Sequence, residues 1–143
     1  MIVNLQRKLK LDAKSFEPFV SRLTEEVTEA GGGSFSVAFI SDRRMKELNG
    51  FFRGKDSTTD VLSFPHESDA FEQKDGDTQN YLGDIVISAE QAQRQAKENK
   101  LTLDYEIRQL ILHGLLHLCG YDHETDNGEM NKRELELRRH LKI

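Results

Sequence analysis

Three histidines, His113, His117 and His123, lie within eleven residues of one another, although the whole chain of 143 residues has five. On a helix, two residues four positions apart project from the same face, one turn above the other. Gly120 can adopt the left-handed conformation that ends a helix, and the turn that follows brings His123 back towards the first two histidines. Three imidazoles that converge on one point predict a site for a divalent transition metal.

Other interpretations of this segment are histidines in solvent at a helix end and a purely structural zinc site. Structural zinc sites usually have four protein ligands, often with cysteine, whereas catalytic sites keep three ligands and an open position. Cys119 is the candidate for a fourth ligand, but two residues after His117 it points about 200° away around a helix. We therefore expect Cys119 to be a small buried apolar side chain and the site to be open.

The residue after the first histidine is Gly114. Zinc peptidases with a similar histidine spacing carry glutamate at this position, where it acts as the general base. The spacing therefore predicts metal-assisted chemistry but argues against an ordinary zinc peptidase.

Length and composition predict one domain, residues 1–143, with an ordinary hydrophobic core, since 36% of the residues are hydrophobic and 31% are charged. No stretch reaches the apolar length of a membrane span, and the N-terminus does not resemble a signal peptide. A single cysteine favours a cytoplasmic location. The net charge of −5 argues against broad, sequence-independent binding to nucleic acid, and no DNA partner is expected.

The elements that must position the histidines follow from periodicity and capping residues. We expect strands at 2–6, 35–39, 61–64 and 82–87. We expect helices from about Ser15 to the glycines at 31–33, from Ser41 or Asp42 to about 49, over 89–99, from Thr102 through the first two histidines, and over 126–141. The helix that begins after Thr102 is apolar almost all round, so it should be central and buried. The last helix should pack through Met130, Leu135, Leu137 and Leu141.

The order of these elements predicts an α+β (mixed α/β) single domain, in which a small mixed sheet is covered by helices. The two strands on either side of residues 66–80 should form an antiparallel hairpin. The connection itself is long and polar, which predicts a mobile segment or a lid. Residues 51–60 form a polar loop, in which Arg53 and Lys55 are candidates for function.

Two further segments extend the pattern around the histidines. The first is Leu48-Asn49, followed by Phe52-Arg53-x-Lys55-Asp56 and by Thr59-Asp60-Val61-Leu62-Ser63-Phe64-Pro65, and the second is Leu82-Gly83-Asp84-Ile85. With the histidine segment, they resemble the YbeY family of bacterial metal-dependent endoribonucleases and rRNA maturation factors, over about residues 48–134 and in the family's order. The chain departs from the family at Thr58, where proline is usual, and at His66, where an aromatic residue is common.

The resemblance implies one zinc ion per chain bound by His113, His117 and His123, with Arg53 as the key basic residue of a cleft. It also implies cleavage of single-stranded RNA, a part in 16S rRNA 3′-end maturation and ribosome quality control, and partners among the proteins and assembly factors of the small ribosomal subunit.

Zinc and Arg53 are expected to lie on either side of the scissile phosphate, with Lys55 adding positive charge and the general base unassigned. Asp84 and Asp122, and also Asp60, are candidates to orient the ligand histidines, although turn, cap or surface roles fit each of them equally well. The alternative functions are a non-catalytic zinc-containing ribosome-assembly factor and a hydrolase of another ester or amide.

Overall fold

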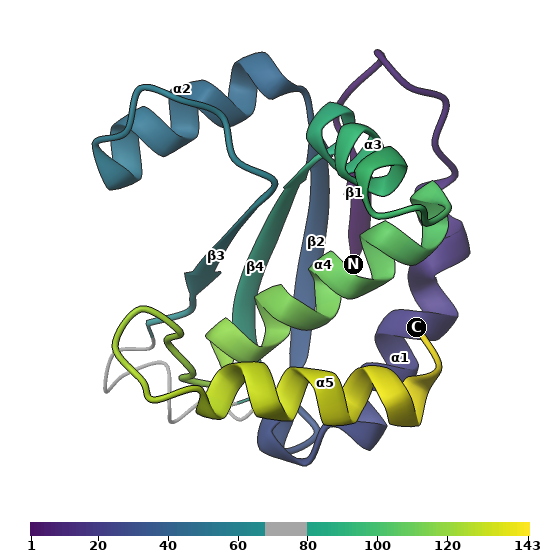
Figure 1. The fold of residues 1–143 in the computed structure, drawn as a ribbon, viewed down its shortest axis with the longest axis vertical. Helices are drawn as coiled ribbons and strands as arrows, with labels where there is room; N and C mark the ends of the chain where they lie inside the picture. The colour runs from purple at the N-terminus through teal and green to yellow at the C-terminus, as the bar shows by residue number, and fades with distance from the viewer. Residues whose placement is uncertain (68–79) are drawn as a thin grey trace.

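A four-stranded sheet forms the centre of the computed structural model, which describes residues 1–67 and 80–143 (Figure 1). The strands stand in the order β1-β2-β4-β3. Their bounds are Ile2–Asn4 for β1, Ser34–Ile40 for β2, Val61–Pro65 for β3 and Tyr81–Ser88 for β4. The predicted mixed sheet and single α+β domain are confirmed in these residues.

Strand pairing fixes which side chains share a face of the sheet. β1, β2 and β4 are parallel, with Val37 opposite Ile85. β3 runs antiparallel to β4, with Leu62 opposite Val86, so the predicted hairpin is present. Most of the connection that was expected to be a lid, residues 68–79, lies outside the described residues.

Within the described residues, five α-helices and two short 3₁₀ helices accompany the sheet. Their bounds are Glu17–Glu26 for α1, Asp42–Arg53 for α2, Ala89–Glu98 for α3, Leu103–Leu118 for α4, Glu129–Leu141 for α5, Ala13–Phe16 for η1 and Thr28–Ala30 for η2. The side chains of Ser41, Ser88 and Thr102 accept a backbone N–H at the starts of α2, α3 and α4. No helix in the described part of the chain is long and apolar enough to cross a membrane.

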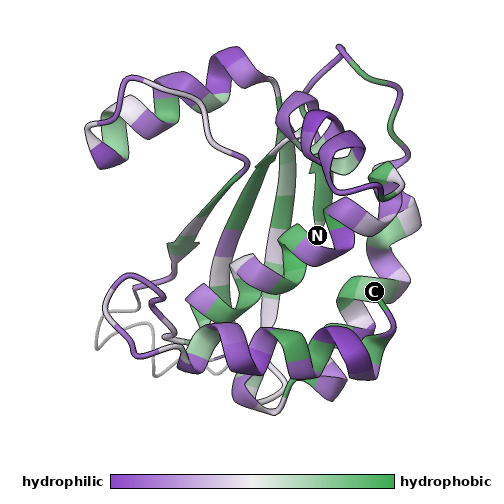
Figure 2. Cartoon of the chain, in the orientation of Figure 1, coloured by the Kyte–Doolittle hydropathy of each residue, from purple (hydrophilic) through white to green (hydrophobic). Residues whose placement is uncertain are grey.

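The main core lies between one face of the sheet and the buried surface of α4, with α1 and α5 packed around it (Figures 1 and 2). Ile85 and Ile87 of β4 meet Ile111 and Leu115 of α4, and all four are fully buried. The predicted central position of this helix is therefore confirmed. Because Ile111 and Leu115 occupy the buried side of α4, His113 and His117 lie on its partly exposed side.

Gly114 brings α4 unusually close to the sheet. A Cβ atom added there would lie 2.8 Å from the Cγ2 atom of the buried Ile85. The glycine therefore has a packing role, since the position after His113 faces the sheet.

The opposite face of the sheet carries a smaller core, in which Met45 of α2 packs with Ile40 and Leu62. Leu48, Phe64 and Val86 are only partly buried against this cluster. This second face is therefore covered less completely than the face that meets α4.

Some element boundaries differ from those expected. α2 continues to Arg53, because Gly50 is accommodated within the helix and Gly54, at φ +66°, supplies the left-handed residue that ends it. Arg53 thus lies in the last turn of a helix and not in a loop. In α5, Leu135 is 46% exposed, so its expected packing role is wrong, whereas Met130, Leu137 and Leu141 are buried.

Candidate metal centre

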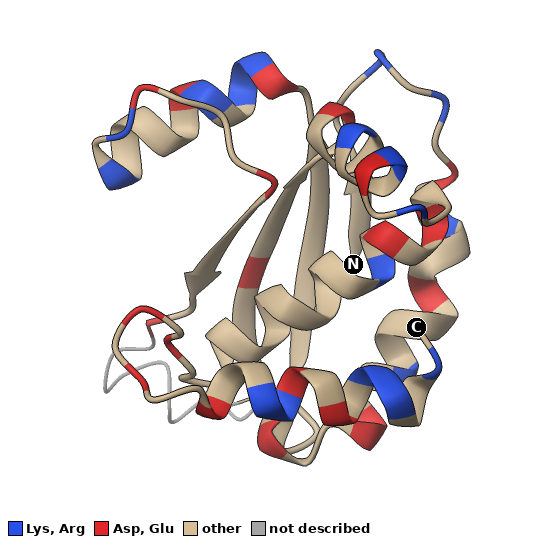
Figure 3. Ribbon diagram, viewed as in Figure 1, with Lys and Arg blue, Asp and Glu red and all other residues tan. Residues whose placement is uncertain are grey.

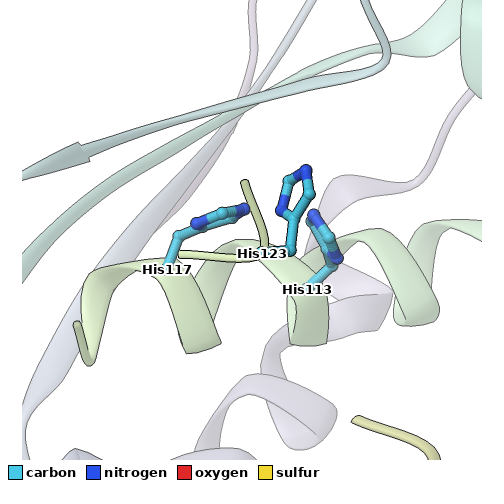
Figure 4. A group of neighbouring side chains, drawn as sticks. All are labelled: His113, His117 and His123. Atoms are coloured by element: carbon cyan, nitrogen blue, oxygen red, sulfur yellow. The ribbon is translucent and has the colours of Figure 1, made fainter. Parts of the chain in front are cut away.

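The three histidines converge at the end of α4 and on the turn that follows it (Figure 4). One ring nitrogen from each of His113, His117 and His123 lies within 4.8 Å of the other two. The ring centroids are 4.8 to 5.5 Å apart. Gly120 has a φ of +103°, so it makes the left-handed turn that the sequence predicts between the helix and His123.

His113 is oriented by a carboxylate from the last helix. Its Nδ1 atom lies 2.6 Å from Oε1 of Glu134 in α5, and Nη2 of Arg138 donates to the other oxygen of that carboxylate at 2.7 Å. Burial raises the pKa of Glu134, but the hydrogen bond and charge of His113 and the charge of Arg138 outweigh this and leave the pKa below its usual value. An ionised Glu134 accepts the Nδ1–H of His113, which leaves Nε2 as the ligand atom.

His117 is oriented by the backbone of the turn. Its Nδ1 atom lies 3.0 Å from the carbonyl oxygen of Tyr121, so the N–H can be donated there. Tyr121 is itself held because its hydroxyl donates to Oε2 of Glu29, at 2.9 Å. Arg133 of α5 donates to both oxygens of Glu29, at 2.7 and 2.9 Å. The turn that carries His123 is thus fixed to two other elements, η2 and α5.

The electrostatics of the cluster favour a neutral His117. Burial lowers the pKa of its imidazole, and the nearby rings of His113 and His123 lower it further. A neutral imidazole is the form that binds a metal ion.

The cluster opens into a cavity of about 640 Å³ between α4, β3 and the end of α2. Arg53 and Lys55 line this cavity together with the three histidines. Nη2 of Arg53 lies 3.3 Å from Oε1 of Glu124, and both side chains are well exposed. Acidic residues are numerous on the turn from residue 122 to residue 129 (Figure 3), and Glu124 of this turn is the partner of Arg53.

The expected orienting carboxylates fall in different places. Asp122 and Asp60 line the cavity, but Asp122 Oδ1 accepts the backbone N–H of Glu124 and Asp60 Oδ1 accepts that of Val61. Asp84 accepts the hydroxyl of Tyr81 and lines a groove on the opposite face of the sheet. The expectation for Asp84 is therefore corrected, since it lies away from the histidines.

Glu134 is the residue of the site that the sequence analysis did not single out. It is only 7% exposed, although a glutamate on a charged helix is usually in solvent. Its spacing of four residues from the buried Met130 places it on the inward side of α5, which is a signal that the sequence does contain.

Two departures from the family pattern have partners in the structure. The hydroxyl of Thr58 donates to Oδ1 of Asp42 at 3.1 Å. This hydrogen bond ties the loop before β3 to the first turn of α2. His66 is exposed and its ring packs against that of Tyr81, with centroids 5.4 Å apart.

The donor set fits a divalent transition metal. Two imidazoles have Nδ1 beside an acceptor, and ligand nitrogens from three rings lie close together. Cys119 is partly buried, and burial, together with the charge of Glu29, raises the pKa of its thiol to about 11. This thiol stays protonated, and it is not a member of the three-residue group.

Three histidines on the central helix and the turn after it, open to a cavity, are the arrangement of a catalytic metal site and so of a metal-dependent enzyme. The family model described as Endoribonuclease YbeY matches residues 1–142, and the chain belongs to this family. This membership confirms the family and the enzyme class that the sequence predicts, a metal-dependent endoribonuclease.

Relatives with the name Endoribonuclease YbeY cover most of the chain. The protein from Nautilia profundicola is 52% identical over 107 residues, which are 75% of this chain and 71% of the relative. The protein from Koribacter versatilis is 41% identical over 145 residues, 100% of this chain and 86% of the relative. The solution structure of TM1509 from Thermotoga maritima, 31% identical, has a TM-score of 0.60 and covers 95% of this chain and 85% of that one.

Proposed function

We propose that the chain binds one zinc ion through His113, His117 and His123 and cleaves single-stranded RNA in the cavity beside them. The observation that carries this proposal is the presence of Arg53 in the wall of the cavity into which the three histidines open. Three imidazoles without a fourth protein ligand among the described residues match an open catalytic zinc site. When bound, zinc supplies Lewis acidity beside the phosphoryl oxygens of the substrate.

Other residues around the cavity bind the phosphate of the substrate or orient the histidines. The guanidinium of Arg53 is a planar forked donor that suits two phosphoryl oxygens at once, and Lys55 adds a second positive charge. Glu134 and the carbonyl of Tyr121 hold the rings of His113 and His117 in place before substrate arrives. Asp122, which lines the cavity beside these rings, remains a candidate to assist them.

The biological substrate that we infer is ribosomal RNA, with action at the 3′ end of 16S rRNA during its maturation and in ribosome quality control. This part of the proposal rests on family membership. It implies a cytoplasmic location and partners among the proteins and assembly factors of the small ribosomal subunit. The net charge of −5 supports recognition through a few local phosphate contacts.

The proposal is tested by measuring zinc content and RNA cleavage in the same preparations. The wild type should contain one zinc per chain and cleave an RNA that has a single-stranded tail, whereas His117→Ala should lose both. His140→Ala is the matched control, because His140 is 60% exposed in the last turn of α5. Zinc without cleavage in the wild type would favour the non-catalytic assembly factor, and a wild type that binds no metal would overturn the proposal.

A further inference from the structure

Two large aromatic side chains are exposed at the end of α2. Phe51 is 83% exposed and Phe52 is 57% exposed, and their rings meet edge to face with centroids 4.9 Å apart. Phe52 also meets Phe64 of β3 edge to face, at 5.0 Å. Clustered exposed apolar groups of this size mark a surface that binds something.

The attachment of α2 to the sheet does not explain this exposure. Met45 is fully buried in the small core and Leu48 packs against the same core, so these residues hold the helix in place. Phe51 lies almost entirely in solvent and adds little to that packing.

Phe52 and Phe64 border two hollows on the surface. Both line the cavity of the metal centre, and both also line an apolar groove of about 430 Å³ on the open face of the sheet. The groove continues over Leu48, Val86 and Val3. The ring of Phe52 is therefore part of the wall that a molecule bound at the histidines would meet.

The charges beside the rings indicate the occupant. Arg53 and Lys55 follow Phe52 in the sequence and line the same cavity, so two cations and an aromatic ring lie on its wall. A single-stranded nucleic acid matches both kinds of group, because its phosphates bind cations and its unpaired bases stack on aromatic rings. A protein partner would match the apolar groove but would not explain why Phe52 and Phe64 also line the cavity of the metal centre.

We propose that Phe52 is a stacking platform for an unpaired RNA base next to the scissile phosphate, with Phe51 extending the platform for the neighbouring base. This inference rests on the proposed function and adds a nucleobase subsite to it. The platform accepts any base, because every base has a face that can stack. Phe52 thereby favours unpaired RNA, since a base within a duplex is already stacked.

The experiment uses zinc-loaded protein and a set of single-stranded RNA oligonucleotides that share one cleavage site. In each oligonucleotide a different nucleotide near that site lacks its base. Stacking of one base predicts that Phe52→Leu raises the KM for intact RNA by about fivefold to a hundredfold. One abasic position should raise the KM of the wild type by a similar factor, and Phe52→Leu should add nothing further on that RNA.

Two control variants test whether the change in KM comes from the aromatic ring at position 52. Phe52→Tyr keeps the aromatic face and should retain the wild-type KM. Tyr105→Leu removes an exposed aromatic residue, 42% exposed, from the start of α4, and it should also leave the KM unchanged. Zinc content and circular dichroism should be the same in all variants.

Each outcome decides between the two proposals. A wild type that contains zinc but cleaves no RNA overturns the proposed function and this inference with it. If the wild type cleaves RNA but Phe52→Leu stays within twofold of its KM, only the platform is overturned, and the groove is then a surface for a protein. If Phe52→Leu does not fold, the abasic series with the wild type decides. One abasic position that raises the KM by about fivefold or more supports the platform, and a series in which every abasic RNA keeps the KM of intact RNA overturns it.

Discussion

The Nδ1 atom of His113 lies 2.6 Å from Oε1 of Glu134, although 21 residues separate them in the chain. This contact joins the helix that carries two ligands to the last helix, and Arg138 holds the same carboxylate from its other side. The geometry of the metal centre therefore depends on the packing of α5 as well as on the histidine segment itself.

The first prediction is that Glu134→Gln weakens metal binding. A neutral amide is a poorer acceptor for the Nδ1–H of His113, so the ring is less firmly oriented and less basic at Nε2. Loss of such an orienting group typically costs about 10- to 100-fold in metal affinity. A titration of the metal-free protein with zinc against a competing chelator measures this change.

Glu136→Gln is the control for that variant, because Glu136 lies on the same helix and pairs with Arg133 at the surface. It should bind zinc as the wild type does. Equal zinc affinity in Glu134→Gln and the wild type would show that Glu134 only packs α5 against α4.

The second prediction concerns Arg53. If its guanidinium binds a phosphate in the transition state, Arg53→Gln should lower the rate of RNA cleavage by about a hundredfold to a thousandfold, with zinc content unchanged. The slope of log K for RNA against log salt should become shallower by about 0.7, the value for one phosphate contact to a single strand. Loss of zinc in this variant would indicate a structural role for Arg53 instead.

The third prediction is that Glu124→Gln tightens RNA binding. Glu124 lies 3.3 Å from Arg53 and competes with a phosphate for it. An exposed pair of this kind contributes about 0.2 to 1 kcal/mol, so the affinity for RNA should rise by about 1.5- to 5-fold at low salt. Measurement of the same ratio at high salt is the control, because screening should remove most of the gain.

Local signals in the sequence were enough to predict most of the fold. Ser41, Ser88 and Thr102 cap the helices as expected, because each places a short polar side chain just before an apolar periodic segment. The histidine spacing and Gly120 likewise predict the cluster, since its three members lie on one helix and the turn after it.

The features that the sequence did not predict depend on contacts between distant segments, or on a helix end for which the sequence offers two glycines. Glu134 reaches His113 only through the packing of α5, which no local pattern specifies. Either Gly50 or Gly54 could have ended α2, and the structure shows that Gly54 does. For Asp84 the signal was present, because alternation along β4 places it on the face opposite that of the buried Ile85 and Ile87.

The fourth prediction is that Gly114→Ala destabilises the protein. The added Cβ would lie 2.8 Å from the side chain of Ile85, which is fully buried and cannot move away freely. Overpacking of this kind costs about 1 to 3 kcal/mol in the free energy of unfolding. Gly50→Ala is the control within α2, where the nearest atom is 3.6 Å away, and it should stabilise the protein by up to about 1 kcal/mol. Urea unfolding of both variants tests whether close packing, and not backbone freedom, requires glycine at position 114.

The fifth prediction concerns Glu29, which joins Arg133 and Tyr121 beneath the turn of the metal centre. The hydrogen bond from Arg133 is the main cause that lowers the pKa of Glu29 from 4.5 to about 2, against the opposing effect of burial. The unfolded chain therefore takes up the proton first as the pH falls. The stabilisation is present above pH 4.5 and is lost as the pH falls from there towards 2.

Glu29→Gln should accordingly lower the free energy of unfolding at pH 7 by about 1 to 3 kcal/mol, as expected for hydrogen bonds to a charged group. The difference from the wild type should shrink as the pH falls below 4.5. Glu25→Gln, at an exposed position of α1, is the control and should follow the wild type at every pH. The histidines titrate in all three proteins, so the difference in the free energy of unfolding between them reports the contribution of Glu29 alone. A difference that stays constant down to pH 2 would show that the glutamate acts through packing and not through its charge.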